Sequence, residues 1–148
     1  NHLGSGLGWR VVLCNGENVM TFRLGKNSMK NMEGIDDRLI DIVELAITIS
    51  PIDFGVPSSG GFRSTEDQAK LYTAGKSKCD GRNNKSYHQT GKAVDVFGYV
   101  DGKASWDTLH LTTIATCLLQ ASSQLGHELQ WGGLWKGFKD LPHFQIKD

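Results

Sequence analysis

The spacing of hydrophobic residues predicts two amphipathic helices. From residue 36 or 37 to about residue 50, apolar residues recur every three to four positions, as expected for one buried helical face. The same spacing predicts the longest helix over residues 107–124, and Gly126 closes it. The inward positions of the two helices are Leu39, Ile42, Val43, Ala46, Ile47 and Ile49, and then Leu111, Ile114, Ala115, Leu118, Ala121 and Leu125.

Capping residues indicate two shorter helices. Ser28 is predicted to cap a short helix that ends before Gly34. Ser64 precedes a further helix that ends at Gly75. Asp67 stands at the position from which a side chain can bond back to the N-cap residue. Both segments therefore begin and end with residue types that satisfy the free backbone groups of helix ends.

Four short apolar segments are predicted as strands, over residues 52–59, 93–97, 128–131 and 143–146. Residues 76–86 are polar and rich in turn formers, which predicts a loop. Helices and short antiparallel strands in this order predict a compact single α+β domain, with the helices packed on a small antiparallel sheet.

The first 19 residues differ from the rest of the chain. Residues 1–8 are rich in glycine without hydrophobic periodicity, and Met20 offers a native start. We therefore expect residues 1–19 to be a leader, introduced by cloning or translated from upstream, that is poorly ordered and irrelevant to function. A short native N-terminal arm is the alternative. Residues 20–148 are the predicted domain.

Charge and hydropathy exclude two classes of partner. Lys+Arg and Asp+Glu are both 16, so the formal net charge of zero gives no bulk attraction to nucleic acid. No run of about 18 apolar residues exists to span a membrane. Cations nevertheless gather within residues 68–92, relieved there only by Asp80. This stretch is either a solvated face or a basic rim that attracts an anionic substrate.

The number and spacing of the cysteines indicate the redox environment in which the protein is made. Cys14, Cys79 and Cys117 are odd in number and lack CxxC spacing, which disfavours a disulfide framework or a thiolate zinc site and favours synthesis in a reducing compartment. Cys117 falls within an apolar helix and is expected in the core. The apolar run at residues 11–13 is too short for the core of a signal peptide.

Two histidines and two aspartates suggest a hydrolytic metal site. His88, Asp95 and His143 together offer two imidazoles and a carboxylate, which would leave one position of a tetrahedral zinc open for water. Gly91 lies between the first two residues and suits a sharp turn with positive φ or a close backbone approach. Asp140 could accept a proton from the water, although a turn residue is the alternative. The remaining histidines, His2, His110 and His127, are not expected to be ligands.

The motif around His88 resembles that of the M15 zinc peptidases, the D-alanyl-D-alanine carboxypeptidase superfamily, and especially the phage L-alanyl-D-glutamate endopeptidases. The pattern SxHxxGxAxD is met by Ser86, His88, Gly91, Ala93 and Asp95, and Gly-Phe-Arg-Ser at residues 61–64 resembles a second family element. The resemblance covers about residues 22–147.

The resemblance implies roles for individual residues. His88, Asp95 and His143 match the zinc ligands, one ion per chain, and Asp140 matches the catalytic acid/base. Arg63 matches an arginine that polarises the scissile carbonyl or holds a substrate carboxylate. Many carboxypeptidase members have Glu where this chain has Asp140, and the phage endopeptidases commonly have Asp.

We therefore expect a zinc-dependent endolysin that binds the peptidoglycan peptide stem and cleaves its L-Ala–D-Glu bond. It would be a monomer, made in the host cytoplasm without a signal peptide and acting on the bacterial cell wall after release. The alternatives are a D,D-carboxypeptidase or D-Ala-D-Ala dipeptidase and, in a different class, a non-catalytic zinc module. Three aromatic residues are expected either in the cleft or in the core, namely Trp131, Trp135 and Phe138.

Overall fold

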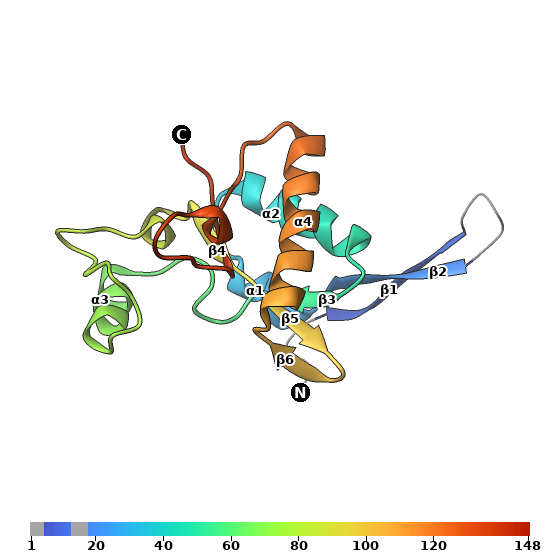
Figure 1. Ribbon diagram of the computed structural model, residues 1–148, viewed down its shortest axis with the longest axis horizontal. Helices are drawn as coiled ribbons and strands as arrows, with labels where there is room; N and C mark the ends of the chain where they lie inside the picture. The colour runs from blue at the N-terminus through green and yellow to red at the C-terminus, as the bar shows by residue number, and fades with distance from the viewer. Residues whose placement is uncertain (1–4, 13–17) are drawn as a thin grey trace.

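The computed structural model of the chain describes residues 5–12 and 18–148. The described α-helices are α1 (Lys26–Asn31), α2 (Asp37–Ile49), α3 (Thr65–Thr73) and α4 (Thr108–Leu125). The strands are β1 (Ser5–Val12), β2 (Asn18–Leu24), β3 (Asp53–Gly55), β4 (Ala93–Asp95), β5 (Phe97–Val100), β6 (Lys103–Ser105), β7 (Gln130–Trp131) and β8 (His143–Gln145). Two short 3-10 helices are η1 (Tyr87–Thr90) and η2 (Gly132–Leu134). In Figure 1, α2 and α4 lie at the centre, α3 lies at one end, and the paired strands β1 and β2 project at the other.

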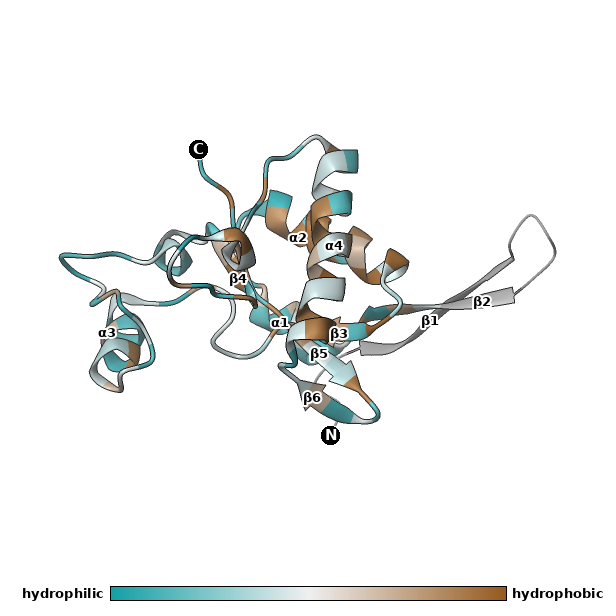
Figure 2. Cartoon of the chain, in the orientation of Figure 1, coloured by the Kyte–Doolittle hydropathy of each residue, from teal (hydrophilic) through white to brown (hydrophobic). Residues whose placement is uncertain are grey.

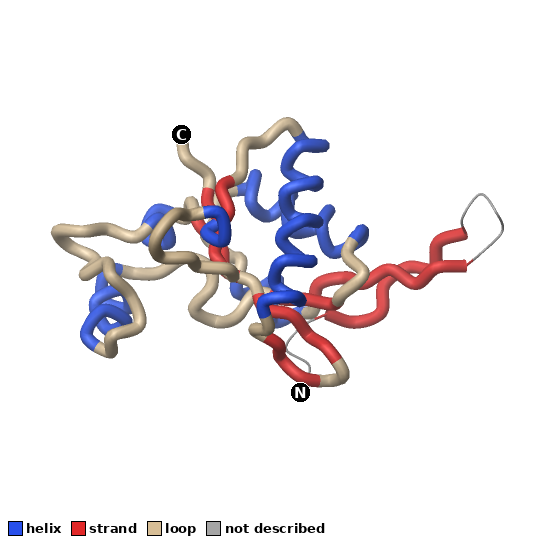
Figure 3. Tube along the Cα trace, viewed as in Figure 1, coloured by secondary structure: helices blue, strands red, loops and turns tan. Residues whose placement is uncertain are grey.

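The α+β class is confirmed, but the strands are divided among several sheets. In the described part of the chain they form three small antiparallel sheets with the orders β1-β2, β3-β5-β6 and β4-β8-β7, drawn in red in Figure 3. The predicted strand 93–97 is split at Val96, because β4 pairs with β8 while β5 pairs with β3. The Val96 N–H donates to Pro142 O at 3.0 Å, outside both sheets. The predicted strand 52–59 shortens to β3.

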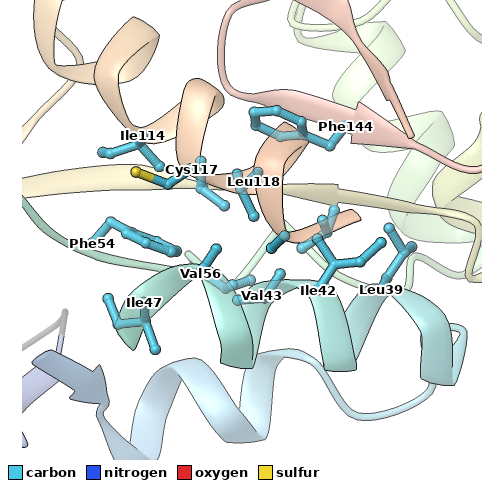
Figure 4. Close-up of a cluster of buried hydrophobic side chains, with 14 of the residues drawn as sticks. Leu39, Ile42, Val43, Ile47, Phe54, Val56, Ile114, Cys117, Leu118 and Phe144 are labelled. Carbon is cyan, nitrogen blue, oxygen red and sulfur yellow. The ribbon is translucent and has the colours of Figure 1, made fainter. Parts of the chain in front are cut away.

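The core lies between α2 and α4 and against the two sheets at the centre of the molecule. Ile42, Val43, Ile114 and Leu118 are fully buried, and Figure 4 shows side chains of the two helices meeting around Phe54. The apolar segments in Figure 2 are concentrated on α2 and α4, whereas α3 and the loop after it are mainly polar. The predicted helical stripes are therefore confirmed as the core.

Two predicted core positions are wrong. Ile49 and Leu125 are 37% and 39% exposed. Each stands at the last residue of its helix, where the axis has passed beyond the packed centre, so helical spacing alone overestimates the length of the buried stripe.

Helix caps follow the sequence at three of the four described α-helices. The side chains of Asp36, Ser64 and Asp107 accept backbone N–H bonds at the starts of α2, α3 and α4. The prediction for Ser28 is wrong, because the N-cap of α1 is Gly25, three residues before Ser28. Ser28 is instead buried, and its Oγ accepts a hydrogen bond from Val56 N at 3.0 Å.

The carboxylate of Asp36 also forms an ion-pair cluster, comprising Asp36, Arg38, Lys92 and Asp148. Both cations pair with both carboxylates at 2.8–3.0 Å. Hydrogen bonds from Arg38 and then Lys92 hold the pKa of Asp36 well below its ordinary value. The cluster ties the start of α2 to the end of the described chain.

Part of the predicted leader has regular structure. β1 pairs antiparallel with β2, from Ser5 opposite Leu24 to Val12 opposite Asn18. The expectation of a poorly ordered segment is therefore wrong for residues 5–12, because pairing with a neighbouring strand can order a segment that has no periodicity of its own. The origin of residues 1–19 stays a prediction, and His2 and Cys14 lie outside the described residues. Among the residues described, no helix has the length and hydropathy required to cross a membrane.

Candidate metal centre and active site

His88 is held by a short capped turn. Ser86 caps η1, its Oγ accepting the His88 N–H at 3.2 Å, and Gln89 Oε1 accepts the Ser86 N–H at 2.9 Å. Gly91 ends the turn at φ +72°, and a Cβ there would lie 2.7 Å from Gly34 O. Both reasons proposed for this glycine are therefore confirmed. The capped turn holds the backbone of the residue whose side chain enters the site.

Strand pairing supplies the other two side chains of the cluster. In the β4–β8 register Asp95 lies directly opposite His143. Asp95 Oδ1 is 3.1 Å from His143 Nδ1 and 3.3 Å from His88 Nε2. One potential ligand atom from each of the three residues lies within 4.8 Å of the other two. Residues up to 55 positions apart in sequence thus converge around one carboxylate oxygen.

The protonation of the two imidazoles suits a cation between them. His88 Nδ1 lies 2.9 Å from Gly61 O, an acceptor only, so this nitrogen carries the proton. His88 Nε2 then carries a lone pair, and this buried atom makes no hydrogen bond although Asp95 Oδ1 is 3.3 Å away. His88 Nε2, His143 Nδ1 and Asp95 Oδ1 lie close together, and two imidazole nitrogens with one carboxylate oxygen are a donor set that zinc takes in proteins, so the residues fit the expected ion.

The same proximity shifts the pKa values of the site. Burial alone would raise the pKa of Asp95, but its contacts with the imidazoles of His143 and His88 outweigh burial and hold that pKa well below its ordinary value. Burial would lower the pKa of His143, and the Asp95 carboxylate reverses this and raises it. An ionised Asp95 gives the site a fixed negative charge, which favours a cation.

Arg63 holds the other oxygen of the central carboxylate. Its Nη2 donates to Asp95 Oδ2 at 3.1 Å, Nη1 donates to Gln68 Oε1 at 3.2 Å, and Nε donates to Ser59 O at 2.9 Å. Gln68 is fully buried, and its Nε2 donates to Ser77 Oγ and Cys79 O. Arg63 thereby orients Asp95 so that Oδ1 faces the imidazoles.

Asp140 stands on the wall of the same cleft. Its N–H donates to Gly132 O at 3.0 Å, and its carbonyl accepts the His143 N–H at 3.2 Å. Burial raises the pKa of Asp140, and the charge of Asp95 adds to this increase. A carboxyl group of this kind beside the cluster has the properties of a general acid/base.

The cleft has a volume of about 570 Å³ and a basic, partly aromatic wall. All five predicted site residues line it, namely Arg63, His88, Asp95, Asp140 and His143. Three cations also line it, and we call Lys76, Lys78 and Lys85 the cleft lysines. The Lys78 ammonium lies 4.5 Å from the centroid of the Phe138 ring. Part of the basic stretch therefore belongs to the site.

The aromatic residues divide between cleft and core. Trp135 and Phe138 line the cleft. Trp131 instead stacks on Phe144 at an interplanar angle of 12° and donates from Nε1 to Leu141 O at 2.7 Å. Cys117 lies in the core as predicted, and Cys79 is a free, half-buried cysteine at the cleft.

Sequence reasoning missed one residue that contacts the cluster directly. Gln145 Oε1 lies 2.8 Å from His143 Nε2 and lines the cleft. Gln145 stands two residues after His143 in a predicted strand, so the two side chains were expected on one face of that strand. This spacing could have identified Gln145 from the sequence. Of the other histidines, His110 is bonded to Ser105 Oγ at 2.7 Å, and neither it nor His127 lines the cleft.

The comparisons with known proteins agree with this architecture. The family model for phage L-alanyl-D-glutamate peptidases matches residues 20–146. The L-alanyl-D-glutamate peptidase of Escherichia phage T5 is 32% identical over 129 residues, which cover 86% of this chain and 91% of that relative. The peptidoglycan L-alanyl-D-glutamate endopeptidase CwlK of Bacillus subtilis is 34% identical over 97 residues, covering 58% of this chain and 57% of CwlK.

A solved structure extends the match to three dimensions. The crystal structure of the Serratia marcescens L-Ala D-Glu endopeptidase ChiX superposes with a TM-score of 0.74 at 34% identity, covering 84% of this chain and 90% of that one. Fold and sequence thus define a peptidase of the M15 class, which confirms the resemblance based on the SxHxxGxAxD motif. More narrowly, the chain belongs to the phage L-alanyl-D-glutamate peptidase family.

Proposed function

We propose that this chain is a zinc-dependent peptidoglycan hydrolase that cleaves the L-Ala–D-Glu bond of the peptide stem. The observation that carries the proposal is the convergence of His88, Asp95 and His143 in a cleft that Asp140 also lines. The names of three relatives give the bond, because each describes a protein that acts on L-alanyl-D-glutamate. The donor set gives zinc, since two imidazoles and one carboxylate leave a position open for chemistry.

Different residues of the chain hold the metal and transfer the proton during hydrolysis. A zinc ion held by His88, Asp95 and His143 would supply Lewis-acid chemistry, polarising the scissile carbonyl and acidifying water. Asp140 takes the proton of the attacking water and returns it to the nitrogen of the departing amine. The raised pKa of Asp140 suits this double role, because the carboxyl must hold the proton between the two steps.

Arg63 positions Asp95 and keeps N–H groups for a contact with the substrate. Three of the five N–H bonds of a guanidinium are engaged by Ser59, Gln68 and Asp95, which leaves up to two for an oxygen of the substrate. That oxygen would be the developing oxyanion or a substrate carboxylate. Removing one donor to an oxyanion typically costs about 3–4 kcal/mol of activation free energy.

The charge of the cleft supports an anionic substrate. The cleft lysines and Arg63 bring four cations, against the two carboxylates of Asp95 and Asp140. A peptide stem that carries free carboxylates would be attracted to this wall and oriented by it. The cleft lysines therefore favour the peptide stem of peptidoglycan over a neutral peptide.

The biological role follows from the proposed activity. We infer an endolysin that is made in the host cytoplasm, works as a monomer and reaches the bacterial cell wall after release. The phage relative of similar length supports the viral source, and an activity that weakens the wall suits lysis.

Digestion of purified sacculi tests the activity and the bond together. The zinc-loaded protein is expected to release fragments with a new amino-terminal D-glutamate, identified by mass spectrometry. Asp140→Asn serves as the matched control, because it keeps the shape of the side chain but cannot accept the proton. Free D-alanine or its dipeptide would assign a carboxypeptidase or dipeptidase instead. No fragments in the presence of zinc would leave the non-catalytic zinc module.

A further inference from the structure

A row of three polar side chains leads away from the cluster. Gln145 stands two residues beyond His143 on β8, so both side chains project from one face of the strand. Its Oε1 lies 2.8 Å from His143 Nε2, and its Nε2 donates to Gln130 Oε1 at 3.0 Å. Gln130 lies directly opposite Gln145 in the β7–β8 register. The row runs from buried His143 through half-buried Gln145 to exposed Gln130.

This row determines which nitrogen of His143 can bind a cation. A neutral imidazole has one N–H and one lone pair. Both ring nitrogens of His143 face an acceptor, and when the ring is neutral, as it must be to bind a cation, a proton on Nε2 donates to Gln145 Oε1 and leaves the lone pair on Nδ1. Nδ1 is the atom that lies 3.1 Å from Asp95 Oδ1 and faces the cluster. The lone pair therefore points at the place where the cation is expected.

The second imidazole has an equivalent outer partner. The carbonyl of Gly61 holds the proton of His88 on Nδ1 and leaves Nε2 for the cluster. A backbone carbonyl thus does for His88 what a side-chain amide does for His143. A carbonyl has a fixed acceptor, whereas an amide can turn its NH₂ toward the imidazole, and the bond from Gln145 Nε2 to Gln130 Oε1 opposes that turn.

We propose that Gln145 is a positioning residue that holds His143 in the tautomer that binds metal through Nδ1, and that Gln130 orients the Gln145 amide. The inference rests on the proposed metal site but concerns residues outside it. Loss of such an outer partner typically weakens metal binding about 10- to 100-fold.

The experiment measures zinc affinity of the full chain by competition with a chromophoric chelator. Gln145→Leu removes the acceptor and is expected to weaken zinc binding by about 10- to 100-fold. Gln145→Glu keeps an acceptor oxygen and is expected to bind zinc at least as tightly as the wild type. Gln130→Leu leaves the inner bond and is expected to have a smaller effect. Gln120→Leu on the exposed face of α4 is the matched control and should change nothing.

A second measurement separates positioning from folding. Thermal unfolding of the metal-free proteins should differ little between the wild type and Gln145→Leu, whereas the increase in melting temperature on adding zinc should be smaller for the variant. The inference would be overturned if Gln145→Leu bound zinc as tightly as the wild type, or if Gln145→Glu weakened zinc binding as much as Gln145→Leu does. It would also be overturned if the melting temperature of Gln145→Leu fell as much without zinc as with zinc. Failure of the wild type to bind zinc would instead overturn the proposed metal site.

Discussion

Replacing Gly132 by alanine would displace the proposed acid/base. A Cβ built on Gly132 lies 2.3 Å from Asp140 O and 3.0 Å from Asp140 Cβ. Ordinary contact begins near 3.4 Å, so the backbone at Asp140 must retreat by about 1 Å. The neighbour is backbone rather than a flexible side-chain end, so rotation of a side chain cannot relieve the overlap.

The expected loss follows from this displacement. A shift of about 1 Å in a catalytic group costs roughly 100-fold in rate, or about 2.7 kcal/mol of activation free energy. The assay is the initial rate of fragment release from sacculi by zinc-loaded Gly132→Ala. Zinc affinity measured on the same sample distinguishes a displaced Asp140 from a displaced His143, whose N–H bonds to the Asp140 carbonyl.

A double-mutant cycle tests the assignment to Asp140. If Gly132→Ala acts through this carboxylate, then adding it to Asp140→Asn should cost little further rate. Gly137→Ala is the matched control in the same loop, because a Cβ there meets no atom within 4 Å. Its φ of +82° costs about 1 kcal/mol of stability, but it does not push on Asp140. Full activity of Gly132→Ala, or fully additive losses in the double variant, would refute the reasoning.

Three further predictions concern the metal, the ion pairs and the basic wall. A chelator should abolish hydrolysis, and added zinc should restore it. His88→Ala should lose zinc in a competition titration, and full zinc affinity in this variant would contradict the ligand assignment. The same variant should lose about 1–3 kcal/mol of stability in denaturant unfolding, because the buried Gly61 carbonyl loses its donor. Asp36→Asn keeps a capping side chain but loses the ion pairs of Asp36 with Arg38 and Lys92. Since the folded pKa of Asp36 is lowered, its contribution is fully present above the unfolded value near about 4 and is lost progressively as pH falls through the lowered folded pKa. The melting temperatures of wild type and variant should therefore differ most at pH 7 and approach each other steadily as pH falls below about 4. Replacing all three cleft lysines by glutamine should lower kcat/KM at low salt more than at high salt. The control replaces three exposed lysines elsewhere, Lys26, Lys30 and Lys103, and should show no such effect. Equal effects of the two triple variants would contradict a role of the cleft lysines in attracting the substrate.

The elements that could be predicted from the sequence are those set by local interactions. Helices α2 and α4 and their buried faces follow from helical spacing, and the caps at Asp36, Ser64 and Asp107 follow from side chains bonded within one turn. The turn at Gly91 follows in the same way, because its positive φ is a property of the residue itself. Each of these features needs only neighbours a few positions away in the chain.

The chemistry of the candidate site was also visible in the residue types. His88, Asp95, Asp140 and His143 were selected from residue types and spacing, Arg63 was implied by the family resemblance, and all five line one cleft. Their spacing could not supply distances, because Asp95 and His143 meet only through a strand pairing across 48 positions.

Tertiary structure alone decided how short strands are shared among sheets and which polar side chains support the cluster. The break at Val96, the separation of Trp131 from Trp135, and the contact of Gln145 with His143 all depend on which distant strand lies alongside. A helix closes its hydrogen bonds within its own segment, so local sequence is sufficient to specify it. A strand of three residues takes its partners from elsewhere in the chain, and its register is set by the packing of the whole domain.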